Sequence, residues 1–120
     1  MSKSSIEYLH HIHDECTFIL SVIKPETTKD ELLDNETLKR AVIRSISIIG
    51  EATKKIPADI KEEWSQIPWR NIAVMRNKLI HEYFGVNYSI VWDVVKNKIP
   101  EMQPLIFEII KIEENKSEES

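Results

Sequence analysis

Three side chains that can act on a phosphate lie close together near the end of one predicted helix: Arg76, His81 and Tyr83. A histidine exchanges a proton near neutral pH, and an arginine guanidinium binds a phosphate through two hydrogen bonds. This pair suffices for RNA cleavage, because the ribose 2′-hydroxyl is itself the nucleophile. The histidine takes the 2′ proton and the arginine offsets the charge that develops on the phosphorane, so neither a metal nor a protein nucleophile is required.

The spacing within the helix restricts how these side chains can meet. Successive helical residues are rotated by about 100°, which places Arg76 and His81 roughly 140° apart. Arg76 and Tyr83 share one face, and Asn77 and His81 share another. Two arrangements bring Arg76 and His81 to one phosphate. Either the helix distorts near His81, or two copies of the chain face each other and line a common cleft.

The elements that must carry these residues are helices. The chain has 2 glycines and 5 prolines in 120 residues, and it lacks the Asn-Gly and Asp-Gly pairs that favour hairpin turns. Apolar residues recur at spacings of three and four along most of the sequence. The sequence therefore predicts an all-α antiparallel helical bundle of about five helices, in a single domain over residues 1–112. Residues 113–120, which are acidic and polar, are predicted to form a disordered tail.

The predicted helices cover residues 5–22, 35–56, 58–66, 68–84 and 90–97, with a short helical turn at 31–33 and a last helix from Pro100 onward. Asn35 is predicted to cap the helix at 35–56, and Ser89 the helix at 90–97. Gly50 lies inside a helix, where glycine costs about 1 kcal/mol relative to alanine. Close contact with another helix would explain why it is there.

The helix at 35–56 carries two further features that bear on the candidate site. Its apolar face is wide for a bundle of this size, which suggests a dimer interface. Glu51 is placed to pair with Arg44 or with Arg76, and in the second case it would hold that arginine in position.

Composition limits the other classes of site. Cys16 is the single cysteine, so the chain has no intrachain disulfide and no thiolate metal cluster. His10, His13 and Asp14 could share a helical face and bind a metal, but surface histidines without a ligand are the favoured interpretation. No metal site and no cofactor are therefore predicted.

Charge and hydropathy bear on partners and on location. The net charge of −4 argues against nonspecific coating of nucleic acid, but it allows a local basic groove. A basic rim for RNA or a solvated face are both open for Lys54, Lys55, Arg70, Lys78, Lys96 and Lys98. No apolar run approaches the roughly 18 residues that span a membrane, and the start of the chain lacks the apolar core of a signal peptide. A cytoplasmic protein is predicted.

Four blocks of sequence, at residues 41–52, 67–72, 75–86 and 90–92, form one ordered pattern. They resemble the HepT-like family of HEPN-domain proteins, and the resemblance spans roughly residues 5–112. The family motif is an arginine, four residues, a histidine, one residue and a tyrosine. It is matched by Arg76, His81 and Tyr83 without a gap, and Asn77 supplies the polar residue that commonly follows the arginine.

The resemblance implies a dimeric HEPN-like bundle whose two motifs line a shared cleft, and a metal-independent endoribonuclease that cuts RNA such as tRNA or mRNA. It implies that Arg76 and His81 act at the scissile phosphate with Asn77 assisting. It further implies a toxin whose partner is a minimal nucleotidyltransferase antitoxin of the MntA type, which adenylylates Tyr83 with ATP. The added charge and bulk beside the cleft would repel RNA.

Two other functions stay open on the sequence. One is a catalytically silent HEPN module that binds a nucleotidyltransferase partner or a nucleotide. The other is a purely structural dimeric bundle, in which Arg76, His81 and Tyr83 have no chemical role.

Overall fold

The computed structural model describes residues 2–81 and 86–119, with the exception of the side chains of Ile80, His81, Ser117 and Glu119. Within this part all regular elements are helical, which confirms the predicted all-α class. The long helices are α1 (Lys3–Val22), α3 (Glu36–Thr53), α5 (Trp69–His81) and α7 (Ile99–Glu119). The short elements are α2 (Lys29–Asp34), α4 (Ala58–Glu63), α6 (Tyr88–Asp93) and a π-helical turn, η2 (Val94–Lys98). None of the described helices is long and apolar enough to cross a membrane.

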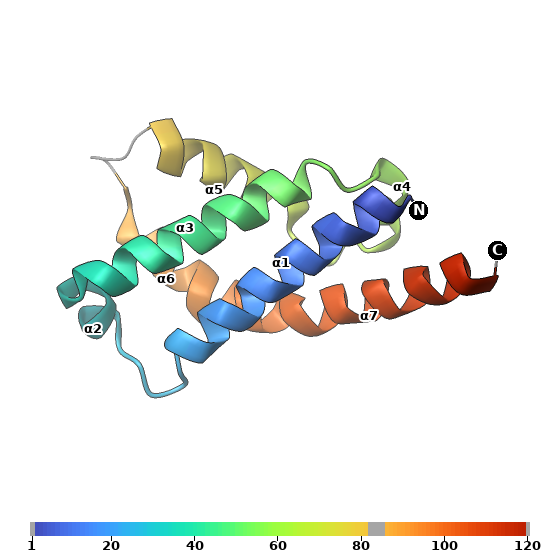
Figure 1. The fold of residues 1–120 in the computed structure, drawn as a ribbon. Helices are drawn as coiled ribbons and strands as arrows, with labels where there is room; N and C mark the ends of the chain where they lie inside the picture. The colour runs from blue at the N-terminus through green and yellow to red at the C-terminus, as the bar shows by residue number, and fades with distance from the viewer. Residues whose placement is uncertain (1, 82–85, 120) are drawn as a thin grey trace.

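The long helices lie side by side in the order α5, α3, α1 and α7, and each runs antiparallel to its neighbour (Figure 1). α3 therefore packs against α5 on one side and α1 on the other. A helix with two neighbours needs apolar residues around a wide arc, and Val42, Ile46 and Ile49 of α3 are all buried within the single chain. Much of this wide face is therefore covered within the single chain, and the dimer stays a prediction.

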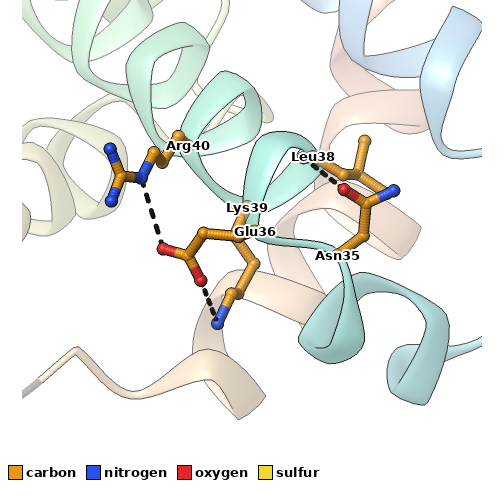
Figure 2. A network of polar contacts seen from close by, with 5 residues as sticks. All are labelled: Asn35, Glu36, Leu38, Lys39 and Arg40. Carbon is orange, nitrogen blue, oxygen red and sulfur yellow. Dashed lines mark hydrogen bonds and ion pairs between the residues drawn. The ribbon is translucent and has the colours of Figure 1, made fainter.

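The first turn of α3 is held by polar contacts (Figure 2). The side-chain oxygen of Asn35 accepts a hydrogen bond from the backbone N–H of Leu38 at 3.0 Å, which confirms the predicted cap. Glu36 pairs with Lys39 at 3.0 Å and with Arg40 at 3.2 Å. The hydrogen bond from Lys39, followed by that from Arg40, holds the pKa of the Glu36 carboxyl below its usual value. A carboxylate in the first turn also suits the helix dipole.

The chain between α5 and α7 differs from the prediction. Asn87, rather than Ser89, caps α6, since its side-chain oxygen accepts from the backbone N–H groups of Ser89 and Ile90 at 3.0 and 3.3 Å. α6, η2 and α7 follow one another without a loop. Pro100 has no N–H to donate to the carbonyl four residues before it, and the helix widens there into a π-turn, closed by the bond from Ile99 to the Val94 carbonyl.

Residues 113–119, predicted to be disordered, instead continue α7. Glu113 is buried, and the Nε2 atom of His10 in α1 lies 2.5 Å from a carboxylate oxygen of Glu114. The polar composition of this segment gives it little apolar surface of its own. The start of α1 lies alongside this segment and supplies contacts that the local sequence does not reveal (Figure 1).

Gly50 marks a close approach of α3 and α5. A Cβ atom at this position would lie 2.3 Å from Cβ of Arg76, 2.8 Å from its Cγ, and 3.2 Å from the carbonyl oxygen of Ile72. The predicted contact with another helix is thus confirmed, and the neighbour is the helix that carries the candidate arginine.

We expect Gly50→Ala to lower the free energy of unfolding by about 1–3 kcal/mol, the usual range for overpacking. Alanine favours a helix by about 1 kcal/mol over glycine, but the Arg76 Cβ atom is fixed to the α5 backbone and cannot rotate away. Urea denaturation followed by circular dichroism measures the change, with Ser47→Ala on the same helix as the control. A net gain in stability for Gly50→Ala would contradict the close approach.

A second prediction concerns Cys16, which lies fully buried in α1. Burial, with a smaller contribution from the charge of Glu15, raises the pKa of the Cys16 thiol to about 12. A shift of this size lowers the fraction of reactive thiolate at pH 8 by roughly a thousandfold. We therefore expect Ellman's reagent to label the folded protein far more slowly than the protein in urea. Equal rates in the two states would show that Cys16 is accessible.

Candidate active site

Arg76 lies in the middle of α5 on the side that faces α3, and its side chain is 23% exposed. Its Nη2 atom lies 2.7 Å from a carboxylate oxygen of Glu51 on α3. Of the two partners that the sequence allowed for Glu51, the structure selects Arg76 rather than Arg44. The missing side chain at Gly50 is what lets the arginine stem lie directly against α3.

Asn77 connects the arginine to a second cation. Its side-chain oxygen accepts a hydrogen bond from Nη1 of Arg76 and another from the ammonium group of Lys54, both at 3.1 Å. Because both partners are donors, the atom between them must be the carbonyl oxygen. This orientation directs the NH₂ group of Asn77 away from the two cations, where it can donate to a negatively charged oxygen.

The guanidinium of Arg76 is held at two points. Nη2 and Nη1 bond to Glu51 and Asn77, while Nε is buried without a hydrogen-bond partner among the described residues. A guanidinium has five N–H groups, so the Nη atoms keep two further hydrogens for a ligand. A cation held in this way needs little reorganisation to stabilise charge on a phosphate.

The other two motif residues are placed less completely. α5 is α-helical from Trp69 to His81, and the four residues after His81 lie outside the described residues. The side chain of His81 and the whole of Tyr83 lie outside the described residues. The structure therefore brings together Arg76 and Asn77, which were predicted, with Glu51 and Lys54.

Sequence reasoning gave Glu51 two alternative partners, Arg44 and Arg76, and it left Lys54 open between a basic rim and a solvated face. The signal for both was present in the spacing. Gly50 indicated a close contact, and Glu51 and Lys54 are three residues apart, hence on one helical face next to it.

The remaining basic residues do not act alike. The ammonium group of Lys96 donates to the backbone carbonyls of Lys24 and Pro25 at 2.9 and 2.7 Å, so it fastens the connection after α1. Arg70 lines a cavity of about 560 Å³ at the start of α5, together with Lys61 and Ser65. Lys96 and Arg70 therefore belong to different parts of the surface, and the basic residues do not form one continuous rim among the described residues.

Two histidines of the cluster near the N-terminus, His10 and His13, contact side chains of α7. His10 contacts Glu114, and His13 lies 3.2 Å from the side-chain amide of Gln103 and packs on the ring of Phe107. Across the ranges that the structure describes, no group of three or more histidine, cysteine or acidic side chains is arranged to hold a metal ion.

Comparison with known proteins shows which family the chain belongs to. "Putative RNase TTE0752" of Caldanaerobacter subterraneus subsp. tengcongensis is 45% identical over 111 residues, which cover 92% of this chain and 98% of the relative. "Probable ribonuclease HepT" of Thermococcus cleftensis is 43% identical over 103 residues, covering 86% of this chain and 93% of the relative. No solved structure matches the chain. Residues 12–109 match the model of the family described as ribonuclease HepT-like, and the chain belongs to this family.

Proposed function

We propose that this chain is a metal-independent endoribonuclease of the HEPN type and the toxin of a toxin–antitoxin pair. The observation that carries the proposal is the fixed guanidinium of Arg76, held by Glu51 and Asn77 on the helix that ends at His81. Membership of the ribonuclease HepT-like family supports RNA as the substrate.

In the proposed reaction the ribose 2′-hydroxyl attacks the adjacent phosphorus. His81 takes the 2′ proton as the new O–P bond forms. The protonated His81 then gives this proton to the 5′ oxygen as the bond from phosphorus to that oxygen breaks, and His81 returns to its neutral form. Arg76 contacts the non-bridging oxygens through its Nη hydrogens, and the NH₂ group of Asn77 donates to the same charge. The products are a 2′,3′-cyclic phosphate and a 5′-hydroxyl, with no proton gained or lost overall.

Two copies of the chain complete the proposed site. In a regular α-helix Arg76 and His81 are separated by roughly 140°, and α5 is regular up to His81. A second copy facing the first would supply a histidine to the phosphate that Arg76 binds. Two exposed apolar side chains support this contact: Val74 of α5, the helix that carries Arg76, is 44% exposed, and Ile90 of α6 is 49% exposed.

The proposed partner is a minimal nucleotidyltransferase antitoxin of the MntA type. It would transfer the AMP group of ATP to the hydroxyl of Tyr83, with release of pyrophosphate. Tyr83 follows Arg76 by seven residues in the sequence, and the helix that carries Arg76 runs to His81. A phosphate attached near the guanidinium would compete for the same positive charge as the RNA.

We expect purified wild type with unmodified Tyr83 to cleave a labelled tRNA mixture in EDTA. His81→Ala and Arg76→Ala should each lower the rate by at least about 100-fold, the range for loss of an acid–base group. His11→Ala, at an exposed histidine of α1, is the control, and mass spectrometry verifies Tyr83. Unchanged cleavage by both site variants would contradict the proposed mechanism. A folded, unmodified wild type that cuts no RNA would favour the silent binding module.

We also expect sedimentation equilibrium to give twice the 14.1 kDa mass of the chain. Val74→Asp combined with Ile90→Asp should shift the protein to a monomer and lower cleavage, because each carboxylate would be desolvated in the contact. Phe107→Asp on α7, at a side chain that is equally exposed, should leave the dimer intact. A wild type that cleaves RNA as a monomer would exclude the shared cleft.

A further inference from the structure

The last turns of α3 place a second cation at the candidate site. The ammonium group of Lys54 and the Nη1 atom of Arg76 each lie 3.1 Å from the side-chain oxygen of Asn77. The two cations are therefore no more than about 6 Å apart, since they share one hydrogen-bond acceptor. This is similar to the separation of successive phosphates along an RNA strand.

The two cations differ in how their charge is balanced. Arg76 is paired with the carboxylate of Glu51 at 2.7 Å, which offsets its charge while orienting it. The described partner of Lys54 is the neutral amide oxygen of Asn77. This bond uses one of the three N–H groups of the Lys54 ammonium and does not neutralise its positive charge. Lys54 is also exposed at the end of α3, where an incoming strand can reach it.

The chain as a whole repels RNA, because its net charge is −4. Binding then depends on a few cations that contact phosphates directly. Lys54 and Arg76 both donate to the side-chain oxygen of Asn77, so the three side chains lie together and present their remaining N–H donors at one place.

We propose that Lys54 binds the RNA phosphate next to the scissile phosphate. The inference rests on the proposed ribonuclease function and adds a residue that contacts substrate without taking part in proton transfer. Lys54 sets the strand in register, so that the scissile phosphate lies at Arg76. It contributes to substrate binding rather than to the rate of the chemical step.

The test compares Lys54→Gln with Lys55→Gln, which makes the same change in charge at the neighbouring exposed residue. The probe is a labelled single-stranded RNA with 2′-O-methyl groups, which cannot be cleaved, and fluorescence anisotropy measures its dissociation constant at several salt concentrations. We expect Lys54→Gln to raise the dissociation constant about tenfold. It should reduce the slope against salt by about 0.7, the value for one phosphate contact on a single strand.

Lys55→Gln should leave both quantities close to those of wild type, and Lys54→Arg should restore binding because it keeps the charge. Cleavage of the unmodified RNA by Lys54→Gln should show a raised KM with kcat retained. Equal effects of Lys54→Gln and Lys55→Gln on binding would overturn the role of Lys54, and so would a fall in kcat of Lys54→Gln with an unchanged salt slope. In either case cleavage by wild type would still support the ribonuclease function. A wild type that neither binds nor cuts RNA would overturn both.

Discussion

The contact between α3 and α5 at Gly50 and Arg76 is the constraint on which the candidate site depends. With no side chain at Gly50, the Cβ of Arg76 occupies space that any other residue would fill. The arginine stem is thereby confined against α3, and its charged end reaches Glu51 one residue further along. A backbone contact between two helices thus fixes the direction of a guanidinium.

The rest of the bundle keeps these two helices in register. α3 is held from the other side by α1, and α1 is in turn covered by α7 (Figure 1). The buried apolar residues of α1 and α3 recur at spacings of three and four, so each helix presents a continuous surface to its neighbours. The polar network of Glu51, Arg76, Asn77 and Lys54 lies at the edge of this core. Its charges remain partly hydrated there, so the desolvation cost that the ion pair must offset is small.

Much of the fold follows from local features of the sequence. The all-α class, the cap at Asn35 and the helical contact at Gly50 were predicted and are found in the structure. The predictions that were wrong lie where contacts with other parts of the chain outweigh the local sequence signal. Asn87 rather than Ser89 caps α6, a π-turn joins α6 to α7 where a break between two helices was expected, and the polar residues after Ile112 continue as helix along α1. The predicted start of the last helix at Pro100 agrees with α7, which begins at Ile99.

For the site, the sequence by itself indicated which residues carry the motif and that Arg76, Asn77 and His81 lie on one helix, because both depend only on residue type and on the helical period. Only the tertiary structure decided that Glu51 pairs with Arg76 and not with Arg44, that Lys54 reaches Asn77, and that the wide face of α3 is covered within the single chain. An amphipathic pattern records which side of a helix is apolar, but not which helix covers it. Contacts between distant residues therefore emerge only when the helices pack.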